Sequence, residues 1–250
     1  MDLLTPPFPV SQRSSILFTA MHDANSVGAH TFSLALAMNL IYNFHAEDEQ
    51  TIKNLVNLSV WIVPVLNADG YTYIMTSEDI RLVQDIKKNR RVSGLCPSDQ
   101  EGVSLTNNYQ YKYEFFQSAS DSPCDHTYRG TTYSSEPEVL SMINLLNHIH
   151  DLKLSVLLES LHNTLIIPYT YLSRYVIDDE TDLWFYSNLH RDMHHKVRQM
   201  GNHHDVEQTL SNGEPVDWFL GARGILSVDW NVGIRESAYT PVSMMTNDIM

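Results

Sequence analysis

Apolar runs of strand length alternate along this chain with segments of helical pattern, and this alternation restricts the folds open to it. The strand-like runs are residues 15–21, 58–66, 153–162 and 223–233, and Asp69-Gly70 predicts a turn after the second of them. The segments with apolar side chains at helical spacing are 27–44, 134–150 and 181–200. Nearly continuous apolar strands between helices are typical of an α/β sheet that helices cover on both faces. In such sheets ligands bind at the carboxyl ends of the strands.

Composition excludes some classes of partner. The chain has 250 residues, of which 43% are hydrophobic, and a formal net charge of −14. A nucleic-acid partner is not expected, because a phosphate backbone requires a concentrated basic face and Lys and Arg cluster only at 87–91. No apolar run reaches the roughly 18 residues of a transmembrane segment. Without a repeat or linker, we expect a single domain over residues 1–250.

Residues 89–134 form a long stretch without periodic pattern, rich in Ser, Asn, Asp, Tyr and Gly. A loop of this length inside a compact domain is usually functional or cross-linked. Cys96 and Cys124 lie within it, 28 residues apart. Two cysteines alone leave both free thiols and a disulfide open.

Candidate site residues fall at the ends of the expected strands. His22 follows the first run and His162 ends the third, while residues 229–232 lie near the end of the last. A zinc enzyme with a His at position 22 would use a Glu three residues later, but this chain has Asn25. These residues predict either a metal site or the remains of one.

Six motifs, in order over roughly residues 15–235, resemble the zinc carboxypeptidase (funnelin, metallocarboxypeptidase A/B-like) family. They are PVLNADGY (64–71), KKNRR (87–91), GVSLTNNYQYKY (102–113), SPCDHTYRGTTYSSEPE (122–138), SLHN (160–163) and NGEPVDW (212–218). The resemblance implies a mixed, mostly eight-stranded twisted sheet flanked by helices on both faces. Because family chains are usually longer, we expect a fold truncated at both ends, without the opening strands and the closing helix.

The resemblance also implies how the metal site has changed. His22 and His162 stand at the family's two zinc-binding His positions, and Asn25 stands at the zinc-binding Glu position. A neutral amide is a poorer zinc donor than a carboxylate and offsets none of the charge of the dication. We therefore expect vestigial ligands, with zinc absent or weakly bound.

The positions that carry the chemistry in the family have changed as well. The general base, a Glu in the family, falls on Asn231, or on Val232 if the last strand shifts by one residue. Neither residue accepts a proton near neutral pH. The pair that grips the substrate carboxylate reads Thr106-Asn107, which lacks the charged fork of an Arg. Arg90 matches the family's polarising Arg and is expected to be retained as a vestigial catalytic and substrate-binding residue.

The resemblance also makes a prediction about the two cysteines. In animal digestive members of the family a disulfide closes this loop, which implies a Cys96–Cys124 disulfide here. We accordingly expect a secretory, extracellular or otherwise oxidising compartment.

Three functional hypotheses follow. The first is an inactive carboxypeptidase-like protein, a pseudoenzyme that acts as a binding or structural subunit in a larger protein assembly or binds peptide C-termini. The alternative is an active zinc metallocarboxypeptidase of altered specificity that removes C-terminal residues from peptides. The third is a lectin-like or small-molecule binder that uses the substrate pocket of the carboxypeptidase fold.

Overall fold

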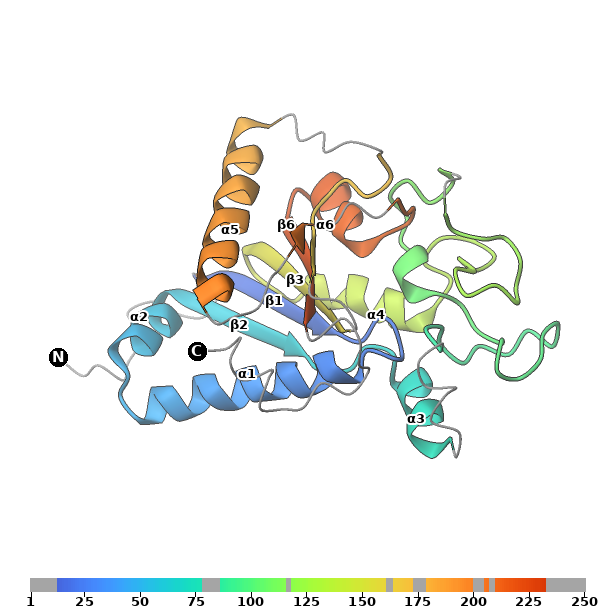
Figure 1. Ribbon diagram of the computed structural model, residues 1–250, viewed down its shortest axis with the longest axis horizontal. Helices are drawn as coiled ribbons and strands as arrows, with labels where there is room; N and C mark the ends of the chain where they lie inside the picture. Colours follow the sequence, from blue (N-terminus) through green and yellow to red (C-terminus); the bar gives the residue numbers. More distant parts are fainter. Residues whose placement is uncertain are drawn as a thin grey trace.

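The computed structural model describes a mixed sheet between helices (Figure 1). The described residues are 13–77, 86–115, 118–160, 164–172, 179–199, 205–206 and 210–232. The strands among them are β1 (Ser14–Ala20), β2 (Leu58–Val63), β3 (Leu152–Ser160), β4 (Thr164–Ile166), β5 (Asp205–Val206) and β6 (Leu226–Val232). They lie in the order β2-β1-β3-β6-β4-β5, and every neighbouring pair is parallel except the antiparallel pair of β4 and β6. The mixed sheet is thus confirmed, with six described strands where the resemblance implied eight.

Helices cover both faces of this sheet. They are α1 (Val27–His45), α2 (Glu49–Asn57), α3 (Ala68–Thr76), α4 (Pro137–Leu146), α5 (Glu180–Gln199) and α6 (Pro215–Arg223), with a short 3-10 helix, η3 (Leu105–Asn107). The central strand β3 explains the two layers, because successive side chains of a strand point to opposite faces. Val156 and Leu158 share one hydrophobic cluster with Phe32 of α1 and Tyr186 of α5. The other face has a cluster of its own, in which Leu157 of β3 lies with side chains of α4 and α6.

Two expected boundaries differ from the structure. Asp69 and Gly70, predicted to mark a turn, lie in the first turn of α3, where the side chain of Asn67 caps the helix by accepting from Gly70 N at 3.1 Å. The strand expected over 223–233 begins only at Leu226, because Arg223 still belongs to α6. Helix α6 ends at Gly224, whose left-handed φ of 65° suits a glycine.

The long irregular segment is confirmed. Between Ile86 and Glu136 the only regular element among the described residues is η3. Figure 1 shows this segment (green) on the side of the molecule toward which the arrow of β2 points, which is the carboxyl end of the parallel strands. The segment can therefore form a wall over the strand ends.

Gly102 allows this segment to approach the chain at Asn89. Its φ is +114°, and a Cβ atom there would lie 1.9 Å from the carbonyl oxygen of Asn89. We expect Gly102→Ala to lower the free energy of unfolding by about 3 kcal/mol, because backbone strain and a backbone clash add together. Gly94→Ala is the matched control, since Gly94 also has positive φ (+72°) but a Cβ atom there would meet no heavy atom within 4 Å. Its cost should be about 1 kcal/mol; equal costs in urea unfolding would contradict this reading of Gly102.

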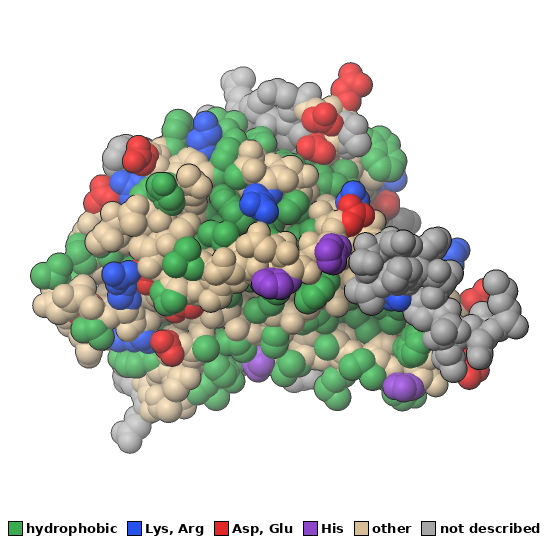
Figure 2. Space-filling model, turned by 180° about the vertical axis from the view of Figure 1, so that it is seen from behind, with side chains coloured by type: hydrophobic (Ala, Val, Ile, Leu, Met, Phe, Trp, Pro, Cys, Tyr) green, Lys and Arg blue, Asp and Glu red, His purple; other side chains and the backbone are tan. Residues whose placement is uncertain are grey.

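The surface carries mixed side chains. On the face in Figure 2, the described Lys and Arg side chains are scattered among hydrophobic and other polar ones. Helix α1 exposes several large apolar side chains, among them Met38, Ile41 and Tyr42, which are 60–72% exposed. Within the described ranges, no helix is both long and apolar enough to span a bilayer.

Candidate functional site

A cavity of about 400 Å³ lies over the carboxyl ends of the strands. Its walls come from the segment after β1, the ends of β3 and β6, the irregular segment around η3, and the residues just before and within α6. Four carboxylic acids line the cavity: Asp23, Glu159, Glu214 and Asp229. The ends of β3 and β6 and the segment after β1 therefore meet at one polar cavity.

His22 is fully buried beneath this site. Its Nε2 lies 3.0 Å from the hydroxyl oxygen of Tyr109, a buried residue that follows η3. Burial lowers the pKa of His22 to about 3 and raises the pKa of Tyr109. The imidazole is therefore neutral. The distance of 3.7 Å between its Nδ1 and Oε1 of Glu159 is thus a close contact and not an ion pair.

Glu159, which the sequence analysis did not single out, faces His22 from the end of β3. Only 5% of its surface is exposed. Its Oε1 accepts from the backbone N–H groups of His22 (2.9 Å) and Asp23 (3.4 Å). Burial, and then the nearby carboxylates Asp23 and Asp229, raise its pKa well above the ordinary value. The signal available in the sequence was an acidic residue near the carboxyl end of an apolar strand.

Strand β6 brings Asn231, and not Val232, to the cavity. Asn231 pairs with Glu159 in the parallel register of β3 and β6 and lines the cavity, whereas Val232 is fully buried in the hydrophobic core. The amide of Asn231 donates to Oδ1 of Asp229 at 3.2 Å. Burial, and then Asp23, raise the pKa of Asp229 to about 8.

Thr106 and Asn107 of η3 also line the cavity, and their predicted role in substrate binding stays a prediction. The Nδ2 of Asn107 donates to Ser211 Oγ and to the carbonyl oxygen of Asn212, both at 3.0 Å. Its Oδ1 accepts from Ser104 Oγ at 2.8 Å. These bonds tie η3 to the segment before α6 and give Asn107 a structural role at the cavity wall.

The structure does not bring Arg90 to the cavity. Its guanidinium stacks 3.9 Å from the ring centroid of Tyr73 and donates to the carbonyl oxygens of Ser98 and Glu101. Lys87, three residues earlier, lines the cavity instead and pairs with Asp23, with 3.4 Å between Nζ and Oδ2. The structure thus places Lys87, and not Arg90, at the cavity, since in an extended segment neighbouring side chains point in different directions. The substrate-binding role of Arg90 stays a prediction.

Two predicted zinc-ligand positions remain, Asn25 and His162. Asn25 is 1% exposed and lies in the turn that leads into α1. His162 lies outside the described residues, so its role as a vestigial ligand stays a prediction.

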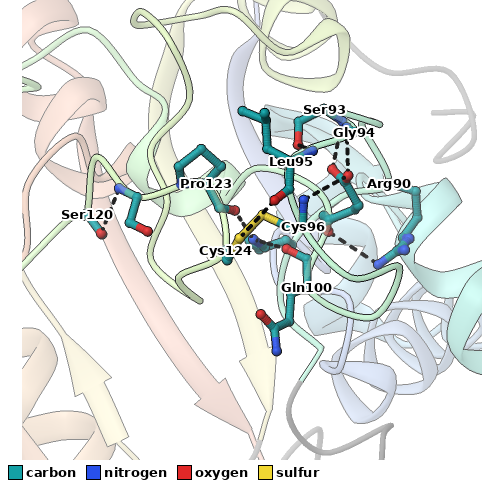
Figure 3. Close-up of a disulfide and its surroundings, with 12 residues drawn as sticks. Arg90, Ser93, Gly94, Leu95, Cys96, Gln100, Ser120, Pro123 and Cys124 are labelled. Atoms are coloured by element: carbon teal, nitrogen blue, oxygen red, sulfur yellow. Dashed lines mark hydrogen bonds between the residues drawn. A yellow bond between two sulfur atoms is a disulfide. The ribbon is translucent and has the colours of Figure 1, made fainter.

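The disulfide between Cys96 and Cys124 is present, with 5.4 Å between the Cα atoms (Figure 3). Beside it, the carboxylate of Glu101 accepts from the backbone N–H groups of Ser93 and Gly94, both at 2.7 Å. These bonds lower the pKa of Glu101 to about 2. The cross-link closes the part of the chain that contains η3, so it supports one wall of the cavity. A disulfide of this kind is typical of oxidising compartments.

Comparison with known proteins decides the family. The zinc carboxypeptidase family profile matches residues 9–245. This chain belongs to the zinc carboxypeptidase family. Mouse carboxypeptidase B2 is 29% identical over 136 residues, which cover 52% of this chain and 30% of that protein. Human mast cell carboxypeptidase A is also 29% identical, over 123 residues that cover 49% of this chain and 28% of that protein. The matched part of the chain thus spans only about three-tenths of these relatives.

Solved structures agree on the fold of this carboxypeptidase-family chain. Bovine thrombin-activatable fibrinolysis inhibitor, solved in complex with tick carboxypeptidase inhibitor, superposes with a TM-score of 0.79 at 21% identity. The match covers 96% of this chain and 78% of the bovine one. At this identity the likeness establishes the fold and leaves the chemistry to the residues of the site.

The residues described for this carboxypeptidase-family site do not fit a catalytic zinc ion. Such an ion needs three protein ligands and an open position for water. Of the three ligands that the resemblance implies, His22 is fully buried, Asn25 is a neutral amide and His162 lies outside the described residues. Among the described residues, no group of three or more His, Cys, Asp or Glu could hold a metal ion.

The buried acids of this carboxypeptidase-family domain should make it less stable at alkaline pH. The folded pKa of Asp229 is about 8 against 3.8 ordinarily, and the pKa values of Glu159 and Glu214 are also well raised. The folded state therefore binds more protons than the unfolded chain, and stability falls as pH rises toward 8. Below pH 6.5 His22 acts in the opposite sense, because its folded pKa of about 3 lies below its unfolded value of 6.5.

We expect the melting temperature to fall by about 5 °C between pH 6.5 and 8.5. Calorimetry at matched ionic strength measures this change. Asp229→Asn removes one of the buried acids and should flatten the profile. A melting temperature that rises over the same interval would contradict these pKa shifts.

Proposed function

We propose that this carboxypeptidase-family domain is a pseudoenzyme that binds ligands in its cavity without hydrolysing them. The observation that carries the proposal is the pairing of Asn231 with Glu159 at the cavity. Asn231 is the residue at the family's base position that faces the site, and its side chain is an amide already bonded to Asp229. An amide neither accepts a proton from water nor offsets the charge of a metal ion.

The sizes of the expected rate losses favour an inactive protein over a slow enzyme. Removing one electrostatic stabiliser typically lowers a rate by about 10² to 10³. Loss of the metal together with the base removes the activated nucleophile itself. Asn107, at the position that would grip the substrate carboxylate, uses its amide in bonds to Ser211 and Asn212.

One observation favours the alternative, an active peptidase of altered specificity. Asp229 and Glu159 both line the cavity and have raised pKa values, as general acids and bases often do. Against this alternative, Asp229 is held by Asn231 and lies two residues along β6 from the base position.

An assay of peptide turnover distinguishes the pseudoenzyme from an active peptidase. The whole chain would be incubated with zinc and a panel of peptides, each in a free-carboxylate and a C-terminally amidated form, with mass spectrometry of the products. We expect no product from either form, while an active zinc carboxypeptidase, run in parallel, cleaves the free forms. Cleavage of free-carboxylate peptides alone, abolished by Asp229→Asn, would overturn the proposal.

We also propose a protein partner and an oxidising, secretory or extracellular compartment. The disulfide supports the compartment, because cytosolic thiols are kept reduced. Exposed apolar side chains on α1, such as Met38 and Tyr42, are compatible with a partner or a larger assembly.

A further inference from the structure

The second half of helix α1 carries apolar side chains on all its sides. The buried residues of α1 all lie in its first half and are Gly28, Ala29, Phe32 and Ser33. Residues 34–44 include two Asn and no charged side chain, and none of them is buried. Four large apolar side chains of this half are 42–72% exposed, namely Leu34, Met38, Ile41 and Tyr42. A helix that is apolar all round is normally covered, so this half is suited to contact with another polypeptide segment.

An open groove of about 680 Å³ lies between this half of α1 and strand β2. It is lined by Arg13, by Ala37, Leu40, Ile41, Phe44 and His45 of α1, by Leu55 of α2, and by residues 58–62 of β2. Leu58, Val60 and Ile62 belong to none of the core clusters that the described residues form. Helix α1 runs alongside the sheet and ends near α2 and the amino end of β2 (Figure 1). The groove is therefore an apolar surface separate from the core.

Strand β2 adds backbone groups to this surface. It stands at one edge of the described sheet, where β1 is its only partner among the described residues, and all six of its residues are half-buried. The outer side of an edge strand presents backbone N–H and C=O groups that can pair with another strand. An added strand takes these bonds and inserts alternate side chains into neighbouring pockets. Six residues of strand span about 20 Å, so a segment of about six residues matches β2.

Charge limits the kind of segment that fits. The described residues that line the groove include Arg13 and His45 but no Asp or Glu, although the chain has 30 acidic residues. Arg13 marks the amino end of β2, because it precedes Ser14, which pairs with Leu58. A carboxylate of the added strand would be attracted to the guanidinium at this end.

A second copy of this chain matches the surface less well. Each copy has a formal net charge of −14, so two copies repel each other. Strand β2, the segment that two copies would pair, has the sequence LSVWIV and carries no acidic side chain to place beside Arg13. The observations thus favour a segment of a different protein.

We propose that β2 and the second half of α1 bind an extended segment of another protein. The segment adds a strand of about six residues beside β2, places alternate apolar side chains in the groove against Ile41, and has an acidic residue at the end beside Arg13. The inference rests on the proposed function in one respect, the protein partner, and names its surface and the chemistry of its segment. It does not involve the cavity at the strand ends.

Calorimetric titration of the whole chain with synthetic peptides tests this proposal. The probes are the acetylated and amidated heptapeptides DVTVTVT and TVTVTVD, which carry the Asp at either end because an added strand can run in either direction. We expect saturable binding of one of them, with a dissociation constant of about 1 mM or below. No binding of either peptide up to about 5 mM would overturn the proposal.

Two changes to the bound peptide distinguish strand addition from hydrophobic contact alone. Lys in place of the Asp should weaken binding about tenfold, because Arg13 then faces a like charge, and Arg13→Gln should remove this preference. N-methylation of two successive central residues keeps every side chain but removes a backbone donor that faces β2, so it should weaken binding at least about tenfold. Equal binding of the methylated peptide would overturn strand addition, and equal binding of the Lys peptide would overturn the acidic end.

Variants of the chain locate the surface. Ile41→Glu places a carboxylate in the groove at a side chain that is 60% exposed, so the fold should tolerate it. Peptide binding should weaken at least about tenfold, because the apolar contact is lost. Leu140→Glu is the matched control and should bind as the wild type does, since Leu140 is 46% exposed on α4, which packs on the other face of the sheet. Unchanged binding in Ile41→Glu, or an equal loss in both variants, would overturn the proposal.

Two further measurements separate the other outcomes. Sedimentation equilibrium of the chain alone, at the concentration of the titration, should show a monomer. A dimer that is lost in Ile41→Glu would assign the surface to a second copy and overturn the segment of another protein. Peptide binding at the groove together with cleavage in the turnover assay would leave the surface standing and overturn the pseudoenzyme. The absence of both would overturn the docking surface alone.

Discussion

Replacing both Cys96 and Cys124 by serine should lower the melting temperature by about 10 °C. The disulfide closes a loop with a sequence separation of 28 residues. In the chain-entropy description such a cross-link contributes roughly 3 to 4 kcal/mol by restricting the unfolded chain. For a domain of this size each kcal/mol corresponds to about 2 to 4 °C. The effect is large because the closed segment has little regular structure of its own and carries η3, a wall of the cavity.

Wild-type protein melted in reductant is the matched control, and it should approach the melting temperature of the double variant. Neither change alters Glu101, whose carboxylate accepts from Ser93 N and Gly94 N, so the comparison isolates the covalent link. A decrease below about 2 °C would show that the folded segment is held by its hydrogen bonds alone.

Replacing Asn25 by glutamate should make stability strongly dependent on zinc. Asn25 is 1% exposed, and the resemblance places it at the family's zinc-binding Glu position. A carboxylate at this buried position would lose its hydration in the apo protein and should cost about 3 kcal/mol. With zinc present, the new carboxylate would complete the ligand set that the resemblance implies, with His22 and His162, so zinc affinity should rise at least about 100-fold.

Asn25→Gln controls for the longer side chain without adding charge. It should show neither the gain in zinc affinity nor a melting temperature that zinc restores. Titration with zinc, followed by calorimetry with and without the metal, measures both effects. Identical behaviour of the Glu and Gln variants would show that position 25 does not face the metal position.

Strands β1, β2, β3 and β6 and helices α1, α4 and α5 could be predicted from the sequence, because the strands are continuous apolar runs and the helices have apolar side chains at helical spacing. Helix α6 was missed for a physical reason. Six of its nine residues, from Pro215 to Leu220, are buried, so it has no exposed polar face and no amphipathic pattern. Helix α3 was read as a turn because Asp69-Gly70 is typical of turns, whereas here Asn67 caps a helix.

The candidate site was predicted in position and in part of its membership. The ends of β1 and β6 place His22 and Asn231, and η3 places Thr106 and Asn107, at or beneath the cavity, while their roles stay predictions. The motifs could not decide which basic side chain of KKNRR faces inward, because one extended segment presents adjacent side chains to different surroundings. Glu159 was missed because nothing in a single sequence shows that its carboxylate faces His22. Such a contact depends on the register of two strands and the turn that follows one of them.

Zinc content of the purified chain is the most direct test of the central claim, that this carboxypeptidase-family site has lost its catalytic metal centre. The protein would be saturated with zinc, dialysed against metal-free buffer and analysed by inductively coupled plasma mass spectrometry beside an active zinc carboxypeptidase. The account predicts far less than one zinc ion per chain, with the control retaining its metal. One zinc ion per chain that survives dialysis and is lost in His22→Ala would contradict it.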